Sequence, residues 1–152
     1  MKETKRTVKL FEDLYDGDPW IGVTTHETLK NITAEHAARK LQPQLNSIWQ
    51  ITNHIISWRE NVLKRLKGEV ITTPTNNYMA SVFDTSETAW QQTIERMQQS
   101  HEKWIPFLKA FDKEDLEEKY KGNDMSYYEH IHGILQHDCY HLGQIVFLTK
   151  VI

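Results

Sequence analysis

The chain has 152 residues, a length that fits one domain spanning residues 1–152. It contains 18 Lys and Arg against 21 Asp and Glu, so its formal net charge is −3. Proteins that bind nucleic acid usually carry a basic excess, and we therefore expect no nucleic-acid partner. No apolar run approaches the roughly 20 residues of a membrane span, and none follows Met1–Arg6 as in a signal peptide. With Cys139 as the single cysteine, we expect a cytoplasmic protein with no membrane partner.

The first part of the chain predicts one helix and a connection. Glycine and proline are scarce, at 6 and 4 residues, which favours long helices. We expect the first helix over residues 3–15, where apolar residues recur every three or four positions, and Asp16–Pro19 ends it. Residues 20–42 are expected to form a connection with one or two short helical turns, one of which begins near Thr33.

The second long helix is expected over residues 45–67. Its apolar residues keep 3.6-residue spacing, and Gly68 lies where a helix commonly ends in a left-handed residue. A polar loop over residues 68–84 follows. The stripe on this helix consists of Ile48, Ile51, Ile55, Trp58, Val62 and Leu66.

Two further long helices complete the expected fold. The third begins at Thr85–Glu87 and extends to Phe111, with Pro106 inside it, so we expect a kink or a restart there. A short turn is expected over residues 112–120. The last helix begins at Ser126, because Ser126 and Glu129 match a capping box. Four long amphipathic helices without a strand pattern predict an all-α four-helix bundle with extra short helical turns in its connections.

The histidines of the last helix are the clearest sign of chemistry. His137 and His141 are four positions apart, so they differ by only about 40° around a helix. Their face also carries Ile134 and Ile145, which places both imidazoles toward the bundle interior. Two neutral imidazoles at this spacing can hold one divalent metal ion. The alternative is that both are ordinary polar helix residues.

A third ligand has to come from another helix, and two histidines compete for that role. His54 lies at the margin of the apolar stripe of the second helix, where it suits the wall of a polar cavity but also an ordinary boundary residue. His101 lies on the core stripe of the third helix. Periodicity alone slightly favours His101 and leaves the choice open.

Other metal and nucleophile chemistries fit less well. His137–His141 has the spacing of the His-Glu-x-x-His proteases with Asp138 in place of glutamate, but residues 142–152 offer no third ligand. A di-iron carboxylate bundle needs two Glu-x-x-His motifs, and only Glu129–His132 has that spacing. Cys139 lies about 160° from the midline of the histidine pair, so we expect no ligand role for it.

Two segments resemble the signature segments of the DinB/YfiT-like superfamily. They are HIHGILQHDCYHLGQI at residues 130–145 and IWQITNHI at residues 48–55. Members of that superfamily are four-helix bundles that hold a divalent metal with one histidine of the second helix and two of the last. The resemblance therefore implies that the ligands are His54 of the second helix and His137 and His141 of the last helix.

The resemblance also decides for His54 over His101 as the third ligand. We expect three further residues of the last helix to line the pocket around the metal without binding it. They are His130, Asp138 and Gln144.

The same resemblance implies a function. The superfamily includes bacillithiol S-transferases, a mycothiol-dependent isomerase and metal-dependent hydrolases. It implies an enzyme that uses a divalent ion, zinc or nickel, to activate a low-molecular-weight thiol as cosubstrate against a small-molecule substrate. The alternatives are a hydrolase that activates water, for which Asp138 is the general base suggested by position, and a non-enzymatic metal- or ligand-binding stress protein. Because many such bundles dimerise, and Trp49 and Ile56 lie off the main apolar stripe, we expect a homodimer.

Overall fold

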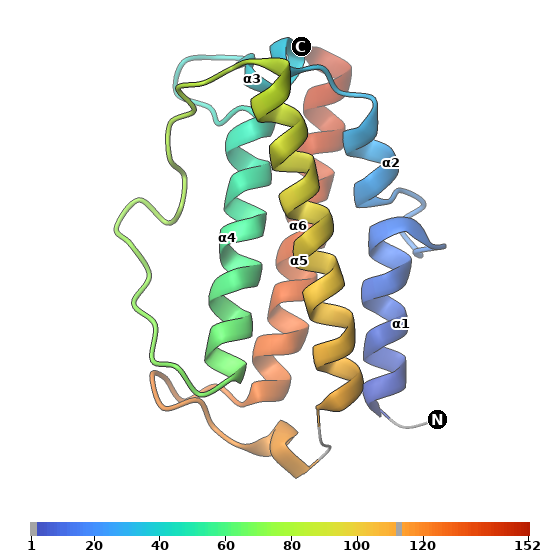
Figure 1. The fold of residues 1–152 in the computed structure, drawn as a ribbon, viewed down its shortest axis with the longest axis vertical. Helices are drawn as coiled ribbons and strands as arrows, with labels where there is room; N and C mark the ends of the chain where they lie inside the picture. The colour runs from blue at the N-terminus through green and yellow to red at the C-terminus, as the bar shows by residue number, and fades with distance from the viewer. Residues whose placement is uncertain (1–2, 112–113) are drawn as a thin grey trace.

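The long helices lie side by side as a bundle (Figure 1) in the computed structural model, which describes residues 3–111 and 114–152. In that part of the chain no β-strand forms, and Lys119 and Ser126 make one isolated bridge. The predicted all-α bundle is confirmed. Its long helices are α1 (Glu3–Asp16), α4 (Ile48–Leu66), α5 (Glu87–Ala110) and α6 (Tyr127–Val151).

The chain direction explains the longest connection. Figure 1 shows α1 and α6 running one way and α4 and α5 running the other. Because α4 and α5 are parallel, the segment between them, residues 67–86, has to cross the full length of the bundle, and it does so along the outside of α4. This crossing brings loop residues to the middle of α4, where the candidate site lies.

Short helices occupy the connections, as predicted. They are α2 (Thr25–Lys30), α3 (Ala34–Ala38) and the 3₁₀ helix η1 (Glu114–Glu117). Thr33 caps α3 by accepting a hydrogen bond from the backbone of His36, which confirms the predicted start there. The turn expected over residues 112–120 includes residues 112–113, which lie outside the described residues. Within the described part, no helix has the combination of length and apolar character that crossing a bilayer requires.

Capping residues set where α4 and α6 begin. Ser47 and Gln50 form a capping box in which the Ser47 Oγ accepts from the Gln50 N–H and the Gln50 Oε1 accepts from the Ser47 N–H. This box, which was not predicted from the sequence, starts α4 at Ile48, three residues after the predicted start. The predicted box of Ser126 and Glu129 is present at the start of α6.

Of the kink or restart expected at Pro106, the restart does not occur. α5 continues through Pro106 to Ala110 as one helix. Proline removes one backbone N–H, but only about one helical turn follows it. Trp104 and Leu108 on either side are 0% and 2% exposed, so their packing holds the final turn in helical conformation.

The bundle has two apolar clusters with a polar layer between them. In α4 the first cluster includes residues up to Ile56 and the second starts at Val62; in α6 the second cluster ends at Ile134 and the first resumes at Ile145. Between these positions both helices carry buried polar residues, namely Arg59, Asn61, Asp138 and His141. The candidate site lies at this level of the bundle.

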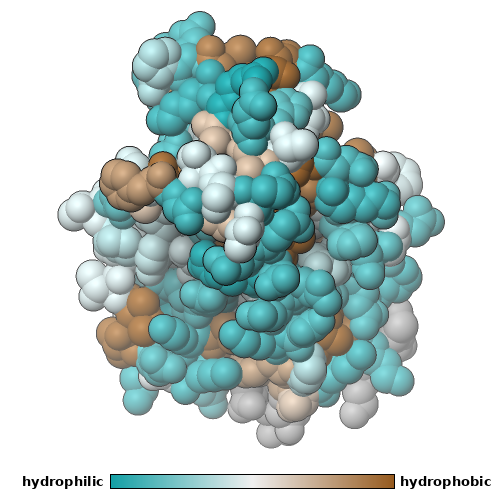
Figure 2. All heavy atoms as spheres, turned by 45° about the horizontal axis from the view of Figure 1, so that its top comes forward, coloured by the Kyte–Doolittle hydropathy of each residue, from teal (hydrophilic) through white to brown (hydrophobic). Residues whose placement is uncertain are grey.

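Trp49 and Ile56 do not form an exposed face of α4, so they give no support to the expected dimer. Trp49 and Ile56 are 2% and 0% exposed, because residues of α3, α5 and α6 pack around the first half of α4. The Trp49 indole N–H also donates to Thr93 Oγ1 at 2.9 Å. Figure 2 shows mainly hydrophilic residues on one end of the molecule, with hydrophobic residues in separate patches.

Candidate metal centre

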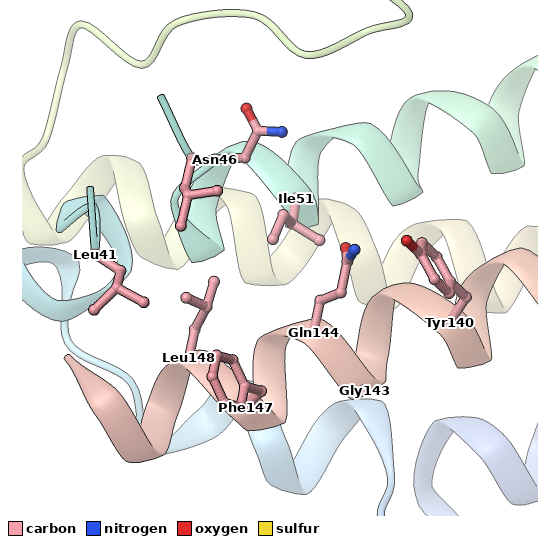
Figure 3. A pocket seen from close by; sticks show the side chains of 9 residues that line it. Leu41, Asn46, Ile51, Tyr140, Gly143, Gln144, Phe147 and Leu148 are labelled. Atoms are coloured by element: carbon pink, nitrogen blue, oxygen red, sulfur yellow. The ribbon is translucent and has the colours of Figure 1, made fainter. Parts of the chain in front are cut away.

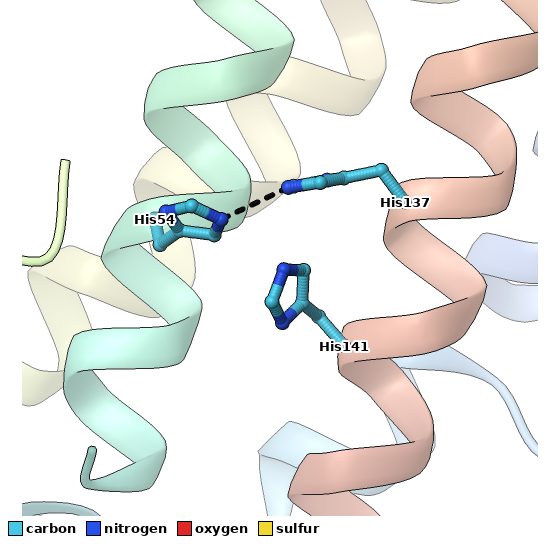
Figure 4. A group of neighbouring side chains, drawn as sticks. All are labelled: His54, His137 and His141. Atoms are coloured by element: carbon cyan, nitrogen blue, oxygen red, sulfur yellow. Dashed lines mark hydrogen bonds between the residues drawn. The ribbon is translucent and has the colours of Figure 1, made fainter. Parts of the chain in front are cut away.

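Three histidines converge between α4 and α6 (Figure 4). His54 comes from α4, and His137 and His141 come from successive turns of α6. One ring nitrogen from each lies within 4.8 Å of the others. His54 and His141 are buried, at 2% and 8% exposure, and His137 is partly buried. The structure therefore brings together the three residues that the resemblance implied.

Each histidine has an oxygen beside its Nδ1 atom. The His54 Nδ1–H donates to the carbonyl of Asn77 at 2.7 Å, and the His141 Nδ1–H donates to Gln144 Oε1 at 2.7 Å. The His137 Nδ1 faces Asp138 Oδ1 at 3.4 Å. Metal-binding histidines commonly donate their second ring N–H to such acceptors, which fixes the tautomer and leaves Nε2 for the ion. The donor set is arranged for coordination through three Nε2 atoms.

The Nε2 atoms of His54 and His137 are 3.0 Å apart. A neutral His54 that donates from Nδ1 has no proton on Nε2, so this contact is favourable only if His137 carries a proton there or a cation lies between the two nitrogens. A tetrahedral ion with metal–nitrogen bonds of about 2.0–2.1 Å separates its nitrogens by about 3.3 Å. The observed contact is close to that separation, so the residues fit a divalent ion.

Burial keeps these imidazoles in the form that binds metal. Desolvation lowers the pKa of His54 from 6.5 to about 4, and the neighbouring His141 and His137 add to this effect. Desolvation also lowers the pKa of His141. Both rings are therefore neutral at pH 7, and a neutral imidazole is the metal ligand.

The Asp138 carboxylate contacts His137 and does not line either of the two cavities near the site. Its carboxylate and the Arg59 guanidinium are both buried at 4% exposure, with Arg59 Nε 3.4 Å from Asp138 Oδ2. The other carboxylate oxygen faces His137. This places Asp138 as a support for the His137 ring, in contrast to the pocket-lining position that we expected.

Asn77 and Tyr78 of the long crossing loop, together called the strap, cover the α4 side of the site. Asn77 accepts from His54 through its carbonyl and from the Trp58 indole N–H through Oδ1 at 3.0 Å. Tyr78 Oη accepts from the Asn61 side-chain amide at 2.7 Å. Asn77 and Tyr78 have φ angles of 52° and 61°, which non-glycine residues adopt at some cost. These hydrogen bonds hold the strained turn against α4.

Two cavities lined by residues of α4 and α6 lie near the three histidines. The larger, about 490 Å³, includes Ile51, Tyr140 and Gln144 (Figure 3). The smaller, about 250 Å³, includes Trp58, His130 and His137. Gln144 thus contacts both His141 and a cavity, and His130 and His137 line the other cavity.

The residues that competed for a ligand role lie elsewhere. His101 stacks on Tyr15 with ring centroids 4.1 Å apart, at the packing of α5 against α1. Cys139 is partly buried, and burial raises the pKa of its thiol. Neither belongs to the group of ligand atoms formed by the three histidines.

Three residues that shape the site were not predicted from the sequence. Trp58 was assigned to the apolar stripe, but it is partly exposed and lines the smaller cavity. Arg65 lines the same cavity, and a helical wheel would have found it, because it lies within about 20° of His54 on α4. Asn77 lies in the crossing loop, where no periodicity marks its approach to His54.

The chain matches a known protein family. The model of the DinB superfamily matches residues 23–145, which include all three histidines. No curated protein and no solved structure is significantly similar to the chain.

Proposed function

Because the chain belongs to the DinB superfamily, we propose that it is a metal-dependent enzyme that transfers a low-molecular-weight thiol of the bacillithiol type to a small electrophile. The observation that carries the proposal is the set of three Nε2 atoms with each Nδ1 beside an oxygen. His54, His137 and His141 would hold the ion. Zinc or nickel is the ion proposed, because both accept imidazole nitrogen.

The bound ion would lower the pKa of a thiol that coordinates it, so that thiolate forms near neutral pH. Transfer of the thiol would form a carbon–sulfur bond at the electrophilic carbon, and the leaving group would depart with the electrons of its bond to that carbon. The thiol proton goes to solvent.

Residues of the protein would bind the two reactants and restrict the access of water to the site. The larger cavity has an apolar wall that includes Leu45, Ile51 and Phe147, and it suits the apolar body of one reactant. The smaller cavity meets the site at His137. The Asn77–Tyr78 strap closes the α4 side, so the open approach is through the cavities.

The position of the carboxylates favours thiol transfer over hydrolysis. A hydrolase of this kind benefits from a general base that removes a proton from water. Asp138, the residue suggested by position, is buried against Arg59. Glu129 lines the smaller cavity, but its Oε2 accepts from the Ser126 backbone N–H. The described residues that line the two cavities thus include no carboxylate free for this role, whereas a thiol whose pKa is lowered needs none.

The test is a reaction of the zinc-loaded protein with a low-molecular-weight thiol and an electrophilic fluorogenic chlorobenzene. We expect the thioether conjugate, detected by mass spectrometry, to form faster than without protein and to disappear for His141→Ala. A matched control is His132→Ala, which removes a histidine from the same helix outside the site. Formation of the hydroxyl product in place of the thioether would support the hydrolase, and neither product with any thiol tested would support the binding protein.

A further inference from the structure

The smaller cavity combines an apolar wall with one cation. Val62, Met125 and Ile134 contribute apolar surface, and Arg65 contributes the only cationic side chain other than histidine among its lining residues. The cavity volume is about 250 Å³, which equals about eight water molecules at liquid density. It has room for one small organic group beside His137.

Two aromatic rings and a hydroxyl hold the Arg65 guanidinium in place, and none of the described carboxylates pairs with it. Its central carbon lies 5.5 Å from the ring centroid of Trp58 and 5.3 Å from that of Tyr120. Nη2 donates to Thr73 Oγ1 at 3.3 Å. Within the part of the chain that the structure describes, Arg65 forms no ion pair with a carboxylate, and its Nε atom is buried without an acceptor. A partly buried cation without a counterion is unfavourable unless a ligand supplies the charge.

His130 forms a fixed neighbour for this cation. It is 4% exposed, and its Nδ1–H donates to the Ser126 carbonyl at 2.9 Å. Its Nε2 therefore faces Arg65 Nη1, at 3.5 Å, as an acceptor. The guanidinium is thus oriented by a buried imidazole, a hydroxyl and two aromatic faces, while donors remain free for an anion.

Glu129 lines the same cavity but forms no ion pair with Arg65. Its carboxylate accepts from the Ser126 N–H at 2.6 Å as part of the capping box. This hydrogen bond lowers the pKa of Glu129, so the cavity wall carries one negative charge there as well as one positive charge on Arg65. That balance suits a monoanion better than a phosphate dianion.

We propose that the smaller cavity binds the carboxylate of a small organic acid, with Arg65 as the residue that pairs with it. This inference rests on the proposed function and names the class of its substrate: the acid group lies at Arg65, and the remainder of the molecule extends past Trp58 toward His137. A planar guanidinium matches a carboxylate through two parallel hydrogen bonds. The substrate is then an electrophile or thiol that carries a carboxylate a few bonds from its reacting atom.

The experiment compares two probes that differ in charge and hardly in shape, phenylacetate and phenylacetamide. Their affinities are measured by calorimetry on metal-free and zinc-loaded protein. We expect phenylacetate to bind at least tenfold more tightly than the amide in both forms. In Arg65→Gln this preference should fall to less than threefold, and in Arg65→Lys it should be intermediate. The control is Lys64→Gln, which removes the same charge from an exposed neighbour and should leave the preference unchanged.

Three results would overturn the inference. One is equal affinity of the wild type for the two probes. Another is a preference that survives both Arg65 substitutions. The third is phenylacetate binding that requires zinc and ignores Arg65, which would place the carboxylate on the metal. If Arg65→Gln does not fold by circular dichroism, the probe pair on wild type and Arg65→Lys decides. The metal-free measurement is independent of thiol transfer, so failure of the proposed function is seen separately.

Discussion

His101 should make the protein sensitive to acid through a physical effect separate from the metal centre. Burial, with a smaller contribution from the charge of Arg59, lowers the pKa of this imidazole from 6.5 to about 4. The unfolded chain then binds a proton at higher pH than the folded chain does. Stability is therefore fully present above pH 6.5 and is lost as the pH falls from 6.5 toward 4.

The magnitude follows from these two pKa values. Between pH 8 and pH 5, a group with pKa 6.5 unfolded and about 4 folded removes about 2 kcal/mol of unfolding free energy. His101 is only partly buried, so solvent screening reduces this to about 1–2 kcal/mol. His54, whose pKa is lowered by a similar amount, adds a comparable loss in the metal-free protein.

The assay is urea unfolding of metal-free protein at pH 8 and pH 5, for wild type, His101→Gln and His26→Gln. We expect the difference in unfolding free energy between the two pH values to shrink by about 1–2 kcal/mol in His101→Gln. His26 has a side chain that is 46% exposed, so its substitution should leave the difference unchanged. An undiminished pH dependence in His101→Gln would refute the assignment of the acid sensitivity to this buried ring.

Three further outcomes are expected from the metal centre. Gln144→Leu removes the acceptor of the His141 Nδ1–H and should weaken zinc binding about 10- to 100-fold in a chelator competition; an unchanged affinity would mean that the hydrogen bond does not orient the ring. Asp138→Leu leaves Arg59 buried without its partner and should cost about 3–5 kcal/mol of unfolding free energy, most of which the double variant with Arg59→Met should restore. Three histidines of ordinary pKa would lose about 50-fold in zinc affinity between pH 7.5 and pH 6. Because the pKa values of His54 and His141 are lowered, we expect a clearly smaller loss by calorimetry, and a full 50-fold loss would contradict those shifts.

Periodicity was sufficient to predict the long helices because each carries its own apolar stripe. The starts of α3 and α6 were predicted as well, since Thr33 and Ser126 act on backbone groups only a few residues away. The restart at Pro106 was a wrong prediction because a proline penalises one local hydrogen bond, whereas the burial of Trp104 depends on residues distant in sequence. The exposure of Trp49 was misjudged for the same reason: it lies off the apolar stripe of α4, but residues of other helices bury it.

The candidate site could likewise be predicted only in part from the sequence. The i, i+4 spacing on α6 was enough to pair His137 with His141, but the helical wheel left His54 and His101 as alternatives, and only the resemblance favoured His54. Contacts that cross the bundle or come from the loop have no periodic signal. The carbonyl of Asn77 reaches His54 because two parallel helices force the chain back along α4, a consequence of topology that the residues themselves do not indicate.

The central claim is that His54, His137 and His141 bind one divalent ion, and a zinc titration tests it most directly. Protein without an affinity tag, stripped of metal, is titrated against a chromophoric chelator for wild type, His54→Ala and His101→Ala. We predict one zinc ion per chain for wild type and His101→Ala, and a loss of at least 100-fold in affinity for His54→Ala. Tight binding retained in His54→Ala and lost in His101→Ala would contradict the account.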